Sequence, residues 1–249
     1  MGRNDELQKG RSEDVRGEEG VDNEEYVEIV RNSMVREEME QGRGVKTVRA
    51  EQKSWMGLGN HATVSGLRNL LWKEAPALVF LSETKLGIEE FRRVRASFDE
   101  YEGMEVDSVG RSGGLTFIWK KHVQCKFRSA SVHHMNFEIT GEEGTWRARG
   151  FYGWPSVTER HLSWELLRVL GSQYNDLWVC IGDFNEVLYA TEMKRGVHAQ
   201  WQMNNFREAV EDCGFRDVDF EGYMFIYDNG QAEEDIRERR IDRALCNEA

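Results

Sequence analysis

The sequence contains no long apolar run. A membrane-spanning helix needs about 18 or more consecutive apolar residues, and no stretch of the chain reaches that length. The opening residues, MGRNDELQKG, also lack the apolar centre of a secretory signal peptide. We therefore expect a protein that is neither secreted nor inserted into a membrane, and whose place is inside the cell, in the nucleus or the cytoplasm.

Cysteine is scarce and scattered. The four cysteines are Cys125, Cys180, Cys213 and Cys246, and no two of them have the CxxC spacing that is typical of a zinc site. In a reducing compartment they are not expected to form disulfides either. We predict that all four are small core or surface residues.

Large aromatic residues are nearly absent from residues 1–50, which contain no tryptophan or phenylalanine but 13 acidic and 9 basic side chains. Such a segment can bury little apolar surface. Within residues 24–40, four apolar side chains recur at helical spacing: Val27, Val30, Met34 and Val35. We predict that residues 1–50 form an acidic tail that is disordered or partly helical, with a partner-binding amphipathic helix as the alternative.

All eight tryptophans and all twelve phenylalanines lie from Trp55 onward, so the folded domain is expected to cover residues 53–249. Apolar runs typical of strands occupy residues 77–83, 115–119, 146–153, 177–183 and 239–245. Helical periodicity or helix signals occupy residues 64–75, 161–170 and 204–213. This alternation, without internal repeats, predicts an α/β sandwich in which two packed sheets are flanked by helices.

Acidic residues outnumber basic ones, which gives the chain a net charge of -12. Because nucleic-acid binding normally depends on a basic surface, this charge argues against tight nonspecific binding to DNA. It does not argue against cleavage. Metal-dependent nucleases use acidic clusters to hold cations, and the cation then meets the phosphate.

Two of the predicted strands end close to a carboxylate, Glu83 after ALVFLS and Asp183 after VCIG. Strand ends are where open α/β sheets bind their ligands, although a single such acid is more often a loop cap or a solvated residue. The two together suggest hydrolysis of a phosphodiester. That reaction needs oxygen ligands for a hard divalent cation and a separate group that activates water.

Seven segments extend this pattern over about 190 residues, in the order LVFLSETK, GGLTFIWK, GFYGWP, RHLSWELL, IGDFNEVL, FREAVEDCGFRD and RRIDRAL. In this order they closely resemble the endonuclease domain of plant non-LTR retrotransposons. That domain is a member of the deoxyribonuclease-I-like superfamily, also called the endonuclease/exonuclease/phosphatase superfamily. The resemblance implies a four-layer α/β sandwich that hydrolyses DNA phosphodiester bonds.

The resemblance also implies roles for individual residues. Glu83 matches the glutamate that binds Mg²⁺ or Mn²⁺, and Tyr152 matches a tyrosine beside the scissile phosphate. Asp183 matches the aspartate that orients and deprotonates the attacking water, and Asn185 matches an asparagine that donates hydrogen bonds to the phosphate. Asp242 matches the aspartate that pairs with a downstream histidine. Taken without the family, each of these is an ordinary cap, strand or surface residue.

Two departures from the family pattern bear on activity. Family domains start with a pattern like SWNCRGLGN, whereas residues 54–60 read SWMGLGN, so the asparagine on the metal side is absent and Asn60 matches a later residue that is not a ligand. Family domains also end with a strand that carries SDH, and the sequence stops at Ala249 before such a strand. We therefore expect a domain that is incomplete at its C-terminus, with weakened metal binding and with weak or no nuclease activity.

None of the six histidines is expected to replace the one in SDH: His61, His122, His133, His134, His161 and His198.

Three readings of the function remain. The first is a DNA endonuclease of reduced activity, and the second is a noncatalytic remnant or binding module with the same fold. The third is a hydrolase of another phosphoester, such as a phosphoinositide or a nucleotide, because a fold does not determine its substrate.

Overall fold

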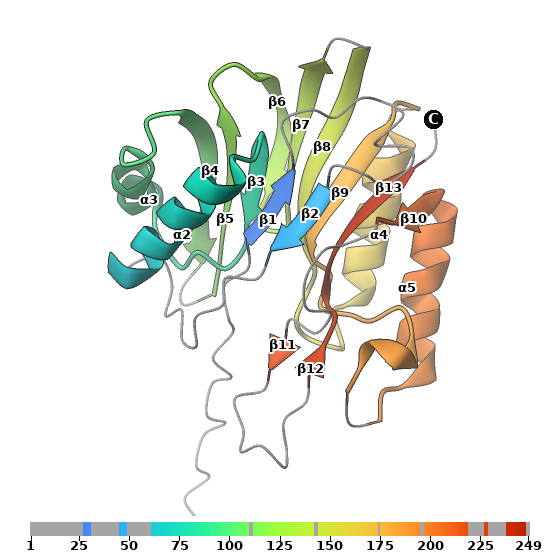
Figure 1. The fold of residues 1–249 in the computed structure, drawn as a ribbon. Coiled ribbons are helices and arrows are strands. Elements are labelled where there is room, and N and C mark those ends of the chain that lie inside the picture. Colours follow the sequence, from blue (N-terminus) through green and yellow to red (C-terminus); the bar gives the residue numbers. More distant parts are fainter. Residues whose placement is uncertain are drawn as a thin grey trace, which may run out of the picture.

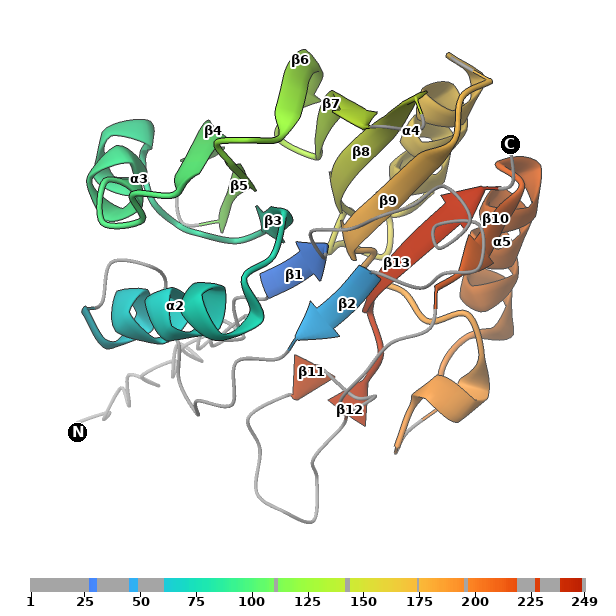
Figure 2. The same ribbon diagram turned by 45° about the horizontal axis from the view of Figure 1, so that its top comes forward.

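Two β-sheets pack face to face, and helices cover the outer face of each (Figure 1 and Figure 2). The computed structural model describes residues 27–30, 45–48, 61–109, 112–141, 144–173, 175–194, 197–218, 227–228 and 238–247. Within these ranges the layers follow the order helices, sheet, sheet, helices. The predicted four-layer α/β sandwich is therefore confirmed.

The first sheet is antiparallel throughout. Its strands, in spatial order, are β2 (Val45–Val48), β1 (Val27–Val30), β3 (Leu78–Leu81), β5 (Ser112–Lys120) and β4 (Tyr101–Val109). The helices α2 (His61–Glu74) and α3 (Ile88–Arg95) cover its outer face. Val79 and Leu81 pack with Leu67 of α2 and Phe91 of α3, whereas Phe80 between them faces the other sheet. This alternation is what a pleated strand buried on both faces requires.

The second sheet contains one parallel pair, β8 with β9, and is otherwise antiparallel. Its strands, in spatial order, are β10 (Phe215–Asp217), β13 (Asp242–Asn247), β9 (Trp178–Asp183), β8 (Gly144–Tyr152), β7 (His134–Gly141) and β6 (Gln124–Ser131). The helices α4 (His161–Ser172) and α5 (Gln200–Asp212) cover its outer face, where Trp164 stacks on Phe206 at 4.5 Å between ring centroids. Shorter elements are the 3-10 helix η1 (Ala190–Glu192) and the strand pair β11 (Tyr227–Asp228) and β12 (Glu238–Arg239).

Aromatic rings fill the space between the two sheets. Phe117 of the first sheet stacks on Phe137 of the second, with ring centroids 4.6 Å apart, and Phe80 lies beside Phe117. Opposite Phe80 the second sheet has Gly150, where an added Cβ would lie 2.1 Å from the phenyl ring. The sheets therefore approach closely at this point because one of them has no side chain there.

The prediction for the N-terminal region is wrong at two segments. Val27–Val30 is a strand, not part of a helix, and it pairs with β3 in the first sheet; Val45–Val48 pairs with it as the edge strand. The physical reason is that VEIV and VKTV are rich in β-branched residues, which favour the pleated backbone over the helix. The other residues of 1–50 lie outside the described ranges, as do residues 54–60. The domain boundary near residue 53 therefore stays a prediction.

No helix of the described residues has the length and apolar character that crossing a membrane requires.

Candidate active site

Three adjacent strands of the second sheet bring three of the predicted site residues into one row. Tyr152 is the last residue of β8 and Asp183 the last of β9, and in this parallel pair they are direct Cα partners. Asp242 is the first residue of the antiparallel β13, and its partner is again Asp183. Residues that are directly opposite on neighbouring strands project to the same face of a sheet. All three side chains are buried, and Tyr152 belongs to the core between the sheets.

Glu83 reaches this row from the first sheet. It lies just beyond the end of β3 and is only 4% exposed, and its Oε1 accepts a hydrogen bond from the hydroxyl of Tyr152. Backbone bonds from Thr84 and Lys85 to the carbonyls of Gly114 and Gly113, each 3.2 Å, hold the segment in place. The glycines of the GRSGG motif thus position the segment that carries Glu83.

Asn185 is fixed beside Asp183 by a tight turn. Its backbone N–H donates to Oδ1 of Asp183 at 2.7 Å, and its side-chain amide donates to the carbonyl oxygen of Gly153 at 2.9 Å. Its φ of 53° is in the left-handed region, which asparagine tolerates better than most residues. The turn therefore fixes Asn185 next to Asp183 and holds its side-chain amide against the carbonyl of Gly153.

The electrostatics of the cluster are those of crowded, buried acids. Burial raises the pKa of Asp183 to about 7; the backbone N–H of Asn185 and the charge of Arg160 oppose that rise, and the charge of Glu83 adds to it. Burial and the neighbouring charge of Glu83 also hold the pKa of the Tyr152 hydroxyl above its usual range. Tyr152 therefore stays protonated and acts as a donor, while Asp183 can both hold and release a proton near neutral pH.

The donor set suits a hydrated magnesium ion and not a closed metal cage. Glu83 supplies hard carboxylate oxygens, and Asp183 and Asp242 add negative charge nearby. In the part of the chain that the structure describes, however, no three carboxylate, imidazole or thiolate groups are arranged to hold an ion. Mg²⁺ commonly binds through one or two carboxylates and keeps several waters, so Glu83 with water ligands fits it, whereas tight protein-only coordination does not fit.

One residue that the sequence did not assign to the site, His133, lies against Tyr152. Its Nδ1 donates to the carbonyl oxygen of Tyr152 at 2.9 Å, and its ring stacks on Trp154 with centroids 3.4 Å apart. Burial lowers its pKa, so the imidazole is mostly neutral at pH 7. Its position depends on the turn between β6 and β7, which no motif in the sequence marks.

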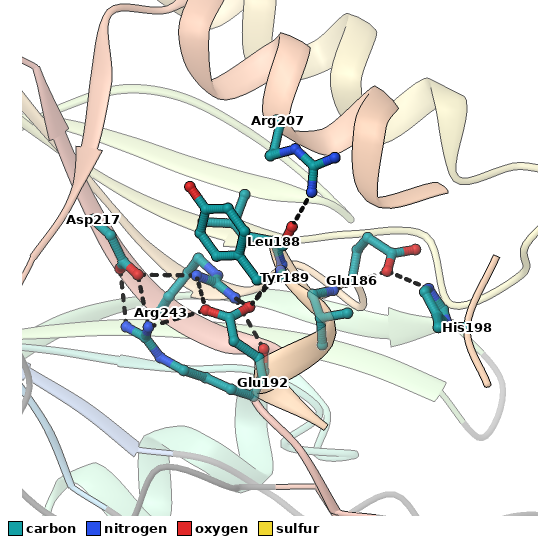
Figure 3. Close-up of polar contacts among 10 residues, drawn as sticks. Glu186, Leu188, Tyr189, Glu192, His198, Arg207, Asp217 and Arg243 are labelled. Carbon is teal, nitrogen blue, oxygen red and sulfur yellow. Dashed lines mark hydrogen bonds and ion pairs between the residues drawn. The ribbon is translucent and has the colours of Figure 1, made fainter. Parts of the chain in front are cut away.

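A buried ion pair joins the two loops that carry the site. Arg160 donates to Oε2 of Glu186 at 2.9 Å and also to the carbonyl oxygens of Trp154 and Pro155, which follow Tyr152. Glu186 directly follows Asn185 and is fully buried, and Figure 3 shows its carboxylate pointing at His198. Burial alone would raise the pKa of Glu186, but the bonds from His198, the backbone of Val187 and Arg160 lower it below its ordinary value.

A second buried network anchors the end of the same loop (Figure 3). Oε2 of Glu192 accepts hydrogen bonds from the backbone N–H of Leu188 at 2.7 Å and from Arg243 at 2.8 Å. Arg243 also donates to Asp217 at 3.0 Å, and Arg240 donates to both acids. The loop after Asp183 and Asn185 is thereby tied to β13 and β10, so the network positions the site without belonging to it.

We expect Glu192→Gln to lower the free energy of unfolding by about 3 kcal/mol, because it removes one of the two carboxylates that pair with the buried Arg243 and leaves only Asp217. Burial alone would raise the pKa of Glu192, but Arg243 and Arg240 hold it below its ordinary value of 4.5. The carboxylate therefore stabilises the fold above that pH, and the contribution is lost as the pH falls through the lowered pKa.

Urea unfolding of both proteins at pH 7 and at pH 3 measures this effect. The difference between them should shrink at the lower pH. The exposed Glu211→Gln is the matched control and should change nothing. A pH-independent difference would contradict the assignment of the effect to the charge of Glu192.

Comparison with solved structures identifies the fold. The endonuclease domain of TRAS1, a telomere-specific non-LTR retrotransposon, superposes with a TM-score of 0.54 and 12% identity over 76% of this chain and 81% of that domain. An AP endonuclease from Archaeoglobus fulgidus superposes with a TM-score of 0.56 and 16% identity, over 75% of this chain and 82% of that protein. The 3′ phosphatase NExo from Neisseria, bound to a product DNA hairpin, superposes with a TM-score of 0.57 and 15% identity, over 75% of this chain and 82% of that protein.

No family model matches the chain, and no curated protein matches it in sequence. The three solved structures named above have the deoxyribonuclease-I-like fold. The chain has their fold, an α/β sandwich of two sheets flanked by helices. At 12% to 16% identity this likeness establishes the fold alone.

Proposed function

We propose that this chain is a Mg²⁺-dependent phosphodiester hydrolase of the retrotransposon DNA endonuclease type, with low activity. The convergence of Glu83, Tyr152, Asp183 and Asp242, from strand ends of both sheets, is the observation that supports it most strongly. Burying acids next to one another costs stability, and local rules of this kind are broken mainly at functional sites.

The residues divide the chemistry among them. Glu83 would hold the cation, and a bound Mg²⁺ or Mn²⁺ polarises a phosphoryl oxygen and offsets its charge. Asp183 orients the attacking water and accepts its proton, for which a pKa near 7 is well suited. Asn185 has a second amide N–H besides the one that Gly153 accepts, and this donor can reach a phosphate oxygen.

Tyr152 has a single hydroxyl proton, which it donates to Glu83. Donation to the phosphate therefore requires that this bond be exchanged when substrate binds. Asp242 lies beside Asp183 in register and, in the family that the sequence resembles, its counterpart pairs with a histidine. Here it adds negative charge near the hydroxyl of Tyr152, which helps to keep that hydroxyl protonated.

Low activity follows from the histidines. His134, His161 and His198 are hydrogen-bonded to Ser131, the carbonyl of Thr158 and Glu186. Of the histidines whose side chains the structure describes, none is hydrogen-bonded to Asp183. Within the described residues no imidazolium is thus placed to offset the charge that develops on the phosphorane, and a donor of this kind contributes roughly 2.7–4 kcal/mol to the transition state.

DNA is the proposed substrate. Two of the similar solved structures, NExo of Neisseria and TDP2 of D. rerio, are described with DNA products bound, which supports this choice. The net charge of -12 does not oppose it, because the cation supplies the local positive field where the phosphate lies. The reading as another phosphoesterase has no comparable support.

A plasmid-nicking assay tests the proposal. Supercoiled plasmid is incubated with the full chain in Mg²⁺, Mn²⁺ or EDTA, next to an intact homologous endonuclease. We expect slow conversion to the open circle with either cation and none in EDTA, at a rate orders of magnitude below that of the homologue. Glu83→Gln should abolish the residual conversion, because the proposed cation ligand is lost.

Two results would overturn parts of the proposal. Nicking at the rate of the homologue would refute the low activity but leave the reaction class intact. No nicking at any enzyme concentration, with either cation, would favour the noncatalytic remnant or binding module of the same fold.

A further inference from the structure

A pocket of about 250 Å³ opens between the start of α4, the start of α5 and the loop that follows Asn185. It is separate from the cluster of Glu83, Tyr152, Asp183 and Asp242, none of which lines it. Two of its lining residues, Arg160 and Glu186, form the ion pair that joins the two loops of the site. The pocket therefore adjoins the candidate active site directly.

The lining of the pocket includes exposed apolar side chains. Trp201 of α5 is 56% exposed although it is one of the largest side chains, and Val157, which also lines the pocket, is 47% exposed. Trp164, stacked on Phe206, forms a buried wall. An exposed indole that lines a cavity is suited to cover the face of a planar ring system.

Two carboxamides on α5 line the same pocket. Gln202 and Asn205 are three residues apart, so they lie on one face of the helix, next to Trp201. The side chain of Gln202 is buried, with the residue only 8% exposed. Within the described residues, neither carboxamide has a hydrogen-bond partner. A carboxamide that lines a pocket and is not used within the protein offers both donors and acceptors, which suits a ligand with acceptors and donors on its edge.

The pocket offers no free charge. The guanidinium of Arg160 is held by Glu186 and by the carbonyl oxygens of Trp154 and Pro155, and Nδ1 of His161 lies 3.1 Å from the carbonyl of Thr158. A phosphate or carboxylate would therefore find no unpaired arginine or lysine in the lining. An uncharged planar group with a polar edge fits the lining better.

We infer that this pocket binds one nucleobase of the DNA strand, taken out of its stack. The inference rests on the proposed function and adds a recognition site to it. The base stacks on Trp201, and its edge exchanges hydrogen bonds with Gln202 and Asn205, since carboxamides form paired bonds with base edges. Glu186, which lines the pocket, directly follows Asn185 in the chain, so the pocket lies beside the turn that carries Asn185.

Binding can be measured without catalysis. Single-stranded oligonucleotides with a 5′ fluorophore are titrated with the full chain in EDTA, and anisotropy gives the Kd. A second series carries 2-aminopurine at each position in turn, whose fluorescence falls when it stacks. Trp201→Ala should weaken binding roughly ten-fold, the effect typical of losing one base–aromatic stack, and should abolish the quenching at one position.

Matched variants separate the pocket from general effects. Trp72 on α2 is 86% exposed and lies on the other sheet's helix layer, so Trp72→Ala makes the same chemical change elsewhere and should leave the Kd unchanged. Asn205→Ala is a second pocket variant, and circular dichroism confirms that each variant is folded. The Asn205→Ala substitution should weaken binding less than Trp201→Ala and should change which of the four bases is preferred.

The inference is overturned if Trp201→Ala and Asn205→Ala bind as tightly as the parent, or if the parent binds no oligonucleotide at all. Its fate is distinguishable from that of the proposed function. Base binding without any nicking would refute the hydrolase and leave the pocket assignment standing. If both pocket variants nick plasmid and bind oligonucleotides as the parent does, the pocket assignment is refuted and the hydrolase proposal stands.

Discussion

An Asp183→Asn variant is expected to lose roughly 10³-fold of the cation-dependent nicking rate, the usual contribution of a general base, while it keeps its fold. The amide oxygen of asparagine can still accept the hydrogen bond from the backbone of Asn185, so the turn is preserved. What is lost is the capacity to take a proton from water. The neighbouring Asn185 and Tyr152 retain their donors.

The same variant should be more stable than the parent at pH 8. Because the pKa of Asp183 is raised in the folded state, to about 7 from its ordinary 3.8, the folded protein binds this proton more tightly than the unfolded chain does. Stability therefore falls as the pH rises from about 4 to 7, and the full penalty is present above pH 7. Asparagine carries no charge and removes this penalty, so the melting temperatures of the parent and of Asp183→Asn should diverge as the pH rises across this range.

Nicking rates, with melting temperatures at pH 4 and pH 8, measure both effects, and the exposed Asp99→Asn serves as control. A variant that nicked as fast as the parent would remove Asp183 from the chemistry. A variant that was destabilised at pH 8 would show instead that the Asp183 carboxylate has a structural role.

The largest effect on stability is expected from Gly182→Ala, with a loss of more than about 4 kcal/mol. Gly182 has a φ of 150°, and an added Cβ would lie 1.8 Å from the carbonyl oxygen of Phe151. The obstacle is backbone of the neighbouring strand, which cannot rotate away as a side chain can. The parallel pairing of β8 and β9 would have to open, and the register of Tyr152 with Asp183 would be lost.

Gly141→Ala is the control for this substitution. Gly141 also lies in the second sheet, but an added Cβ there would meet only the carbonyl oxygen of Gly144, at an ordinary 3.8 Å. Urea unfolding should find this variant close to the parent, and Gly182→Ala unfolded or far less stable. Equal midpoints for the two variants would mean that β8 and β9 are not as closely paired as described.

The sequence predicted the sandwich because its buried strands are continuous apolar runs. LVFL of β3 and WVCI of β9 are too short and too apolar for surface helices, and each is followed closely by a polar or acidic residue. It failed at Val27–Val30, because VEIV within a charged segment fits both a helical and an extended pattern. Pairing with β3, which decides between them, is a tertiary contact that local periodicity does not contain.

The sequence predicted those residues of the candidate site that belong to recognisable motifs. The structure adds which of these residues lie close together. Glu83 and Asn185 follow strands and Asp183 ends one, so their approximate place could be derived, whereas their roles stay predictions. The contact of His133 with Tyr152 and the pair of Glu192 with Arg243 join residues far apart in the chain. Such partners follow from the register of strands and turns, which a single sequence does not specify.

The insertion of β13 between β9 and β10 bears on how the chain is made. While a ribosome is still producing the residues before Asp242, β9 has β8 on one side and an open edge on the other. Open edges recruit foreign strands, and pairings between distant segments form slowly. The nascent chain is thus exposed to aggregation until β13, the strand that carries Asp242, has been made. Pairing of β13 with β9 then closes this edge and also completes the row of acidic residues.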